Sequence, residues 1–271
     1  QRHPGRAKRA GRQGHAHGGG RAGSITLSEG ATRQGYPWGP REVLVGIGGF
    51  IAVMIAVNAA LVLAMAAQGD EFVPRDVGDT FKKAAEVARY ADERLQAAAA
   101  GAALPDPPVI LADQGMLQLS LIATLFSQGA LFGVVGIASK QTFRGLAESL
   151  GLDRFDWGGM WLPALMVLVA YAGTFLWVIA ASATGISWLQ PESTVPTEIT
   201  RDDLTLSIAA VVTVVGAPFS EELFFRGLVF GGLLRWGFWP AASISGAMFA
   251  LVHFDPGSMA PFFMIAVLLS W

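Results

Sequence analysis

The sequence has no cysteine among its 271 residues, and only 15% of them are charged. Without cysteine there is no disulfide framework, no thiolate metal site and no cysteine nucleophile. The low charge is unusual for a soluble domain, in which about 25% of residues carry charge. The sequence also lacks a glycine-rich phosphate loop, a G-x-S-x-G segment and an H-E-x-x-H segment, so these signatures of nucleotide binding and hydrolysis do not apply.

Long uncharged apolar blocks are what the chain has instead. Residues 43–68 and 161–186 contain no charged side chain, and residues 114–139 form a third such block. Each block exceeds the roughly 20 residues that an α-helix needs to cross a bilayer. The sequence therefore predicts an all-α, polytopic integral membrane bundle.

Three further apolar segments complete the predicted bundle. Residues 204–236 form a long fourth span that contains Pro218, where the missing backbone donor predicts a kink or break. A fifth span follows at about 240–254. The sixth segment, 258–271, has 14 residues, which give about 21 Å of helix for about 30 Å of hydrocarbon. We therefore expect about five full spans plus a truncated sixth, and we expect the protein to continue beyond Trp271.

Composition divides the chain into regions. The first 41 residues hold ten glycines and eight Arg or Lys against a single acid, a composition that predicts a disordered basic tail, 1–41. The first span, 42–68, is followed by a polar helical segment, 69–107, and then by the membrane core, 108–271. Within this core, residues 205–271 carry the chemically informative motifs described below.

Charge counts orient the chain. The basic tail is expected in the cytoplasm by the positive-inside rule, which makes the segment 69–107 extracytoplasmic. We therefore predict a multi-pass protein of the cytoplasmic membrane with a cytoplasmic N-terminus. The tail is expected to lie against anionic lipid headgroups, so membrane lipid is a predicted partner and nucleic acid is not.

Charged side chains inside the fourth span form the candidate site. Glu222 and Arg226 are four residues apart, so they share a helix face and can pair, whereas Glu221 points about 100° away. In the next apolar segment, Phe249 and His253 are also four apart. An antiparallel turn between the two helices would bring Glu221 and His253 to nearly the same depth in the membrane. A carboxylate and an imidazole around one water form an arrangement for general-base hydrolysis.

Other interpretations fit the same residues. The Glu222–Arg226 pair can simply fix the packing of two helices, and a single histidine in an apolar helix is often a hydrogen-bonded core residue. The protein would then be a non-catalytic membrane scaffold or immunity protein. An ion or proton pathway is a third reading, which the lack of ionisable residues in the first three spans disfavours.

Two segments resemble the motifs of a known family. "EELFFR" at 221–226 is similar to the E-E-x-x-x-R motif, and "FALVH" at 249–253 to the F-x-x-x-H motif, of the CPBP intramembrane endopeptidases. This family includes the CAAX prenyl protease and Abi-type proteins. Such enzymes hydrolyse a peptide bond of a membrane-associated protein or peptide, which becomes the predicted substrate class.

The resemblance also implies residue roles. Glu221 would be the general base that activates water, and Glu222 and Arg226 would orient it. His253 would hold the water or stabilise the oxyanion, and Phe249 would shape the substrate pocket. The family's third motif, H-x-x-x-N or a variant, lies on a later helix, and the sequence ends before reaching it.

Whether a metal takes part is left open by the sequence. No cofactor is required by the glutamate-activated water, although family members have been described as metalloproteases and zinc is the metal that a Glu and His set would hold. A catalytic zinc usually has three protein ligands, and only Glu221 and His253 are clearly available. We therefore favour a metal-independent glutamate mechanism.

Overall fold

Four stretches of the chain are described by the computed structural model, namely residues 36–67, 77–150, 161–191 and 196–270. They belong to one compact unit, Gly35–Trp271. Every regular element in these stretches is a helix, so the prediction of an all-α bundle is confirmed. The predicted tail lies outside the described residues except for its last six positions.

Among the described residues, four helices are long and apolar enough to cross a membrane, which makes this a multi-pass membrane protein. They are α1 (Pro40–Ala66), α4 (Gln114–Ser139), α6 (Trp161–Thr184) and the fourth span (Asp203–Trp236). The fourth span contains α7 (Asp203–Ala210), α8 (Ala217–Glu221) and α9 (Gly231–Leu233). Shorter helices are α2 (Val77–Ala99), α3 (Val109–Ala112), α5 (Phe143–Ser149), α10 (Phe238–Leu251) and α11 (Met259–Leu269).

The predicted fifth span is shorter than a full crossing. Helix α10 has 14 residues and ends at Leu251. A turn follows and leads into Pro256. The described bundle therefore has four full-length helices and two shorter apolar ones, rather than about five full spans and a truncated sixth. Helix α1 begins at Pro40, and the side chain of Trp38 before it is already buried.

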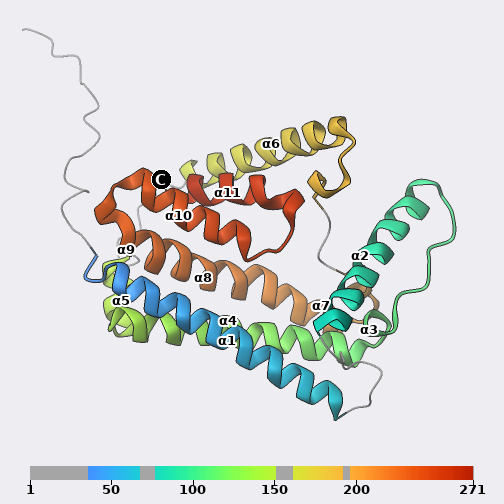
Figure 1. The fold of residues 1–271 in the computed structure, drawn as a ribbon, viewed down its shortest axis with the longest axis horizontal. Coiled ribbons are helices and arrows are strands. Elements are labelled where there is room, and N and C mark those ends of the chain that lie inside the picture. The colour runs from blue at the N-terminus through green and yellow to red at the C-terminus, as the bar shows by residue number, and fades with distance from the viewer. Residues whose placement is uncertain (1–35, 68–76, 151–160, 192–195, 271) are drawn as a thin grey trace, which may run out of the picture. The chain divides into compact units, whose positions relative to one another are not determined.

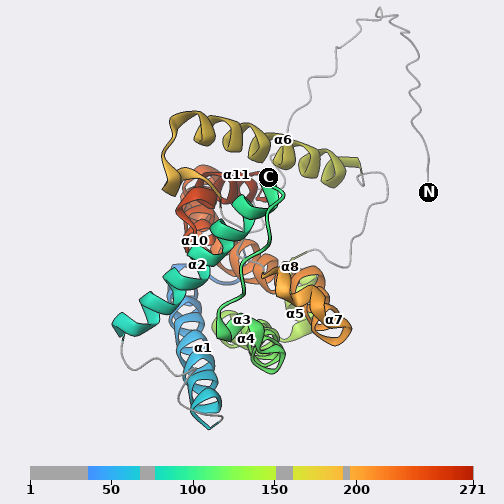
Figure 2. The same ribbon diagram turned by 90° about the vertical axis from the view of Figure 1, so that its right-hand side faces the viewer.

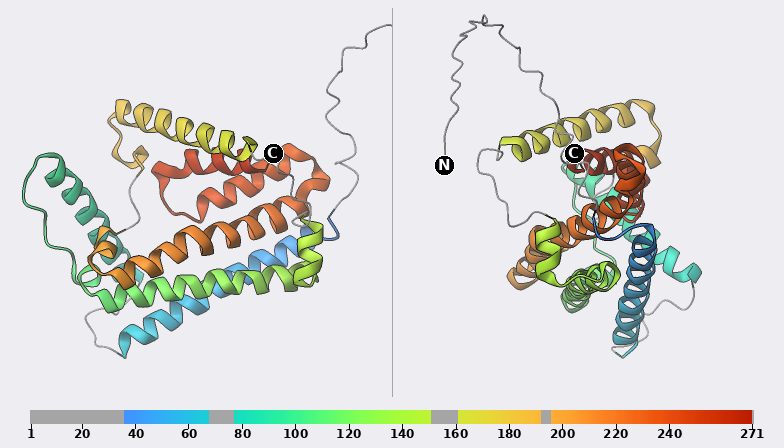
Figure 3. Two further views of the ribbon diagram at one scale, coloured as in Figure 1. Left: turned by 180° about the vertical axis from the view of Figure 1, so that it is seen from behind. Right: turned by 90° about the vertical axis from the view of Figure 1, so that its left-hand side faces the viewer.

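The fourth span occupies the centre of the packing. Helices α1 and α4 lie along each other (Figure 1), and both contact the fourth span. On its other side the fourth span contacts α10, which pairs with α11, while α6 packs on α11 (Figures 2 and 3). The core follows this arrangement, since Phe224 and Leu228 of the fourth span are almost fully buried. The motif residues are thus built on the most enclosed helix of the described bundle.

Aromatic side chains connect the layers. The rings of Phe224 and Phe50 of α1 lie 5.2 Å apart, and those of Phe225 and Phe249 of α10 lie 5.3 Å apart in an edge-to-face arrangement. Such pairs contribute about 0.5–1.5 kcal/mol each beyond the area they bury. The hydroxyl of Ser245 also donates a 2.7 Å hydrogen bond to the carbonyl oxygen of Phe225. Together these contacts fix α10 beside the residues that follow Glu221.

A kink or break was expected at Pro218, and the fourth span shows no break there. Gly216 and Ala217 keep helical dihedral angles, with φ of −61° for both and ψ of −54° and −56°. Instead, the helix widens into π-helical turns at Val211–Gly216 and Glu222–Phe230. A π-helical turn can accommodate the ring and the missing donor of a proline without ending the helix. The fourth span therefore continues through Pro218 without a break.

Three glutamines of α4 attach this helix to the chain leading into and along the fourth span. Gln114 donates to the carbonyl of Glu198, Gln118 donates to Thr205, and Gln128 donates to the carbonyl of Val212 in the first π-helical turn. Within the described residues, the side-chain oxygen of Gln128 has no hydrogen-bond partner. This oxygen lies against Gly216, where there is no room for a side chain.

The polar helix α2 is held by a buried carboxylate. Glu198, in the 3₁₀ turn Thr197–Arg201, is 1% exposed and accepts hydrogen bonds from Tyr90 (2.6 Å) and Arg94 of α2. Burial raises the pKa of Glu198, but the hydrogen bonds from Tyr90 and the backbone, together with the charge of Arg94, outweigh it, so that the pKa lies below its usual range. The attachment therefore depends on the ionised carboxylate.

Substitution of Gly216 tests the packing of α4 on the fourth span. A Cβ at this position would overlap Gln128 Oε1, so Gly216→Ala should lower the free energy of unfolding by about 1–3 kcal/mol. Gly133→Ala is the control, because a Cβ there meets nothing within 4 Å. It should be neutral or stabilise α4 by up to about 1 kcal/mol. Thermal unfolding in detergent measures both changes, and equal effects would contradict the described packing.

Acidification should release α2. Because the folded state favours the ionised form of Glu198, its contribution to stability is present above the usual glutamate pKa and is lost as the pH falls through the lower, folded pKa. Hydrogen exchange of the α2 amides should therefore accelerate in that acidic range. Glu198→Gln should remove this dependence, whereas Glu93→Gln, which changes an exposed pair with Arg89 on the same helix, should preserve it. Identical pH profiles in both variants would contradict the role of Glu198.

Candidate active site

The motif residues of the fourth span lie where α8 passes into the second π-helical turn. Glu221 is the last residue of α8, and Glu222 and Arg226 belong to the turn that follows. Arg226 Nη1 and Glu222 Oε1 are 3.4 Å apart, so the pair expected from the spacing is present. The two partners differ in environment, since the side chain of Glu222 is 49% exposed and that of Arg226 is 10% exposed.

The guanidinium of Arg226 is buried with little hydrogen bonding. Its central carbon lies 4.5 Å from the centre of the Phe249 ring, a distance at which a cation and an aromatic face attract each other. Its Nε, Nη1 and Nη2 atoms have no hydrogen-bond partner among the described residues. Buried donors without partners reduce stability, so the contacts to Glu222 and Phe249 only partly offset the burial of this charge.

His253 lies beyond the end of α10, in the turn that follows Leu251. The predicted fifth span, 240–254, would have included His253, but α10 ends before it. Phe249 lies on α10 and is buried. The Nδ1 atom of His253 is 2.7 Å from the carbonyl oxygen of Phe249. Because a carbonyl oxygen only accepts hydrogen bonds, Nδ1 must carry the proton. In the neutral ring, Nε2 is then an unprotonated acceptor.

Glu221 and His253 come into the same neighbourhood. Glu221 is partly buried and lies within electrostatic range of His253, Arg226 and Glu222. The packing of α10 on the fourth span, through Phe225 and Phe249, accounts for this proximity. Glu221, Arg226, Phe249 and His253 thus come together where these two helices meet. Glu222 pairs with Arg226 but lies on the side of α4 and α5.

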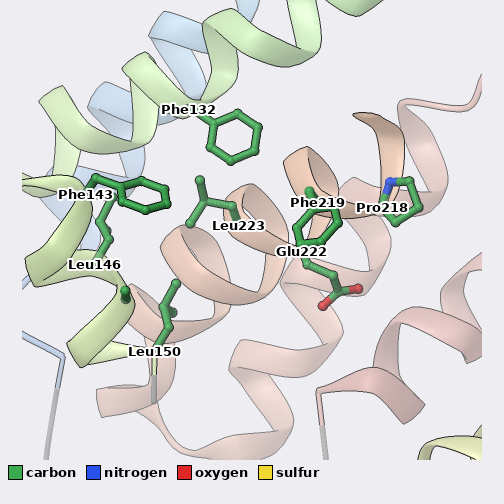
Figure 4. Close-up of a pocket in the computed structure, with 9 residues that line it drawn as sticks. Phe132, Phe143, Leu146, Leu150, Pro218, Phe219, Glu222 and Leu223 are labelled. Atoms are coloured by element: carbon green, nitrogen blue, oxygen red, sulfur yellow. The ribbon is translucent and has the colours of Figure 1, made fainter. Parts of the chain in front are cut away.

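An apolar groove reaches the site from the side of α5. It has a volume of about 490 Å³ and is open to the surroundings. Figure 4 shows Glu222 beside Phe219 at one end of the groove, with its carboxylate pointing away from Phe132 and Phe143. The other lining residues come from α4, α5 and the fourth span: Phe132, Phe143, Leu146, Ala147, Leu150, Pro218, Phe219 and Leu223. A long apolar group could lie in the groove with one end close to Glu222.

The donor set does not form a metal site in the described part of the chain. No three His, Asp or Glu side chains cluster there, and a catalytic zinc usually takes three protein ligands. Glu221 and His253 alone do not complete such a set. We therefore derive no chemical step through a metal.

The structure adds contacts that the sequence did not indicate. The His253 ring stacks on Phe262 of α11, with ring centres 4.1 Å apart and 29° between the planes. Phe262 is one of many apolar residues in α11, so nothing in the sequence distinguishes it. The hydrogen bond from Ser245 to the Phe225 carbonyl was not predicted either, although Ser245 shares the spacing of four with Phe249 and His253.

Replacing Arg226 tests whether its ion pair with Glu222 stabilises the folded protein. Arg226→Met removes a buried guanidinium that makes no hydrogen bond within the described residues, so the free energy of unfolding should stay within about 1 kcal/mol of the parent value or rise. Arg94→Met should lower it by about 2 kcal/mol, because it leaves Glu198 buried with a lost partner. Denaturation in mixed detergent micelles compares the two. A larger loss for Arg226→Met would identify a structural pair.

Comparison with known proteins finds one family model that matches part of the chain. A family model described as type II CAAX prenyl endopeptidase Rce1-like matches residues 203–271. The matched segment is a minor part of the chain, but it contains the fourth span, α10 and α11 and thus every candidate site residue. No curated protein and no solved structure matches the chain. The family resemblance predicted from "EELFFR" and "FALVH" is therefore confirmed over residues 203–271, which match the Rce1-like type II CAAX prenyl endopeptidases.

Proposed function

We propose that the protein is an intramembrane endopeptidase in which Glu221 activates water for hydrolysis of a peptide bond. The observation that carries this proposal is that a partly buried carboxylate lies near an imidazole whose Nδ1 contacts the Phe249 carbonyl. In the neutral ring this contact leaves Nε2 as the hydrogen-bond acceptor. Charged residues within a span are costly, and function is the usual reason for retaining them. The match of residues 203–271 to a protease family supports the same reaction class.

One water between Glu221 and His253 would be well oriented for attack. A carboxylate oxygen and the imidazole Nε2 are both acceptors, so each takes one O–H of the water. The lone pairs of the water oxygen are then directed away from both groups, towards a substrate carbonyl. This arrangement assigns His253 to holding water. Donation from Nε2 to an oxyanion would require the protonated ring.

The reaction then proceeds in two balanced steps. The water oxygen bonds to the carbonyl carbon of the substrate, and one proton of the water moves to Glu221. At the same time the electron pair of the C=O bond moves onto the carbonyl oxygen. When this tetrahedral intermediate collapses, the C–N bond breaks and the proton passes from Glu221 to the leaving amine. The positive charge of Arg226, within electrostatic range of Glu221, offsets the charge of that carboxylate, and Glu222 pairs with Arg226.

The surroundings support a membrane-associated substrate. The groove beside Glu222 is apolar and open, so it suits a lipid-modified or apolar protein segment that approaches within the bilayer. Exposed Lys140 and Arg144 lie near the end of α4, and Asp202 and Asp203 begin the fourth span at its other end. By the positive-inside rule this distribution supports a cytoplasmic N-terminus in a cell membrane.

A cleavage assay tests the proposal. The protein in proteoliposomes is given a fluorogenic peptide that ends in a prenylated CAAX sequence, chosen from the description of the matched family. Glu221→Gln should reduce cleavage by about 10²–10⁴-fold, because it removes the general base while keeping the side-chain shape. Glu148→Gln is the matched control, since Glu148 forms an exposed pair with Arg144 on α5.

The same assay separates the competing readings. Full cleavage by Glu221→Gln would refute the general-base role. Absence of cleavage by the parent protein, with correct insertion and unchanged stability in Glu221→Gln, would favour a non-catalytic scaffold or immunity protein. Proton flux across the liposomes that depends on Glu221 would instead indicate an ion pathway.

A further inference from the structure

We propose that Phe262 of α11 is a positioning residue that holds the His253 ring with Nε2 directed to the reacting water. The inference rests on the proposed hydrolase function, but its structural part can be tested without any substrate. Phe262 lies outside both motif segments, on a third helix of the site.

Three contacts fix the orientation of the imidazole. Its Nδ1–H donates to the carbonyl of Phe249, its ring tilts by 55° against the Phe249 ring at 4.8 Å, and it stacks on Phe262 at 4.1 Å. The hydrogen bond selects the tautomer, and the ring contacts restrict rotation about the outer torsion, which is otherwise broad for histidine. Of the two ring contacts, the one with Phe262 has the shorter separation of ring centres.

The backbone around His253 cannot supply this orientation alone. His253 lies two residues after Leu251, the last residue of α10, and thus outside the regular helix. The next residue, Phe254, has a φ of 52°, a conformation that is costly for a bulky residue. The chain thus turns sharply at the histidine, so the ring direction depends on side-chain packing rather than on a helical rotamer.

Phe262 is itself held firmly enough to act as a support. Its ring packs edge-to-face on Phe249 at 6.0 Å, and α11 pairs closely with α10. The neighbouring Phe263 lies against Gly246 of α10 instead. The two adjacent phenylalanines therefore have separable tasks: Phe262 contacts the histidine, and Phe263 contributes to helix packing.

Loss of the stacking face should free the ring. In Phe262→Leu the pocket keeps an apolar side chain but loses the flat surface, so the imidazole can rotate and give up the bond to the Phe249 carbonyl. The neutral ring would then exchange between its two tautomers. Because the water is held less often in the reactive position, kcat should fall while KM is unchanged.

The experiment compares Phe262→Leu with Phe262→Tyr and with the matched control Phe263→Leu in the full chain. The first readout is the ¹⁵N NMR signal of the imidazole, which distinguishes the two tautomers. The chain has four histidines, and His253→Gln identifies the signal of His253. The second readout is cleavage of the prenylated CAAX peptide, resolved into kcat and KM.

The expected result has two parts. Phe262→Leu should convert the Nδ1–H signal of His253 into that of a tautomer mixture and lower kcat about three- to tenfold, whereas Phe262→Tyr and Phe263→Leu should preserve both. An unchanged His253 signal in Phe262→Leu, or the same change in Phe263→Leu, would overturn the proposal. If the parent protein cleaves nothing, the hydrolase function fails, while the NMR comparison still decides whether Phe262 orients His253.

Discussion

Charge buried in a hydrocarbon environment must be paired or must reach water, since an isolated charged side chain costs at least about 2.5–3.5 kcal/mol at the centre of a bilayer. The fourth span meets this constraint with three charges in six residues. Arg226 lies between the carboxylate of Glu222 and the ring of Phe249. Glu222 lines the open groove, and Glu221 lies within electrostatic range of His253. The contact of Arg226 with Phe249 and the proximity of Glu221 to His253 both require α10 to lie against the fourth span.

Close packing and a change of helix geometry make that arrangement available. Gly46 of α1 and Gly216 of the fourth span leave no room for a Cβ beside Leu228 and Gln128, so the neighbouring helices approach closely. The π-helical turns let the fourth span continue through Pro218, and they alter the direction in which the residues after Gly216 point. The fold thereby turns two adjacent glutamates to different surroundings, an open groove and a histidine, without interrupting the helix.

The sequence was sufficient for the features that depend on composition and on the period of the helix. Uncharged blocks predicted α1, α4 and α6, and the spacing of four predicted the Glu222–Arg226 pair. The response of the helix to Pro218 was not predictable, because a proline can be relieved either by a break or by a wider turn. The end of α10 before His253 and the stacking on Phe262 were also hidden, since they depend on contacts between helices.

The proposed chemistry requires Glu221 and His253 to face each other between the fourth span and α10. The chain has no cysteine, so a pair of introduced cysteines reports proximity without background. Glu221→Cys combined with His253→Cys should be joined readily by a short thiol-specific cross-linker in membranes. Glu221→Cys combined with Leu95→Cys on α2 should not, because α2 is attached through Glu198 at the far end of the fourth span. Equal cross-linking of the two pairs, or none between positions 221 and 253, would contradict the account.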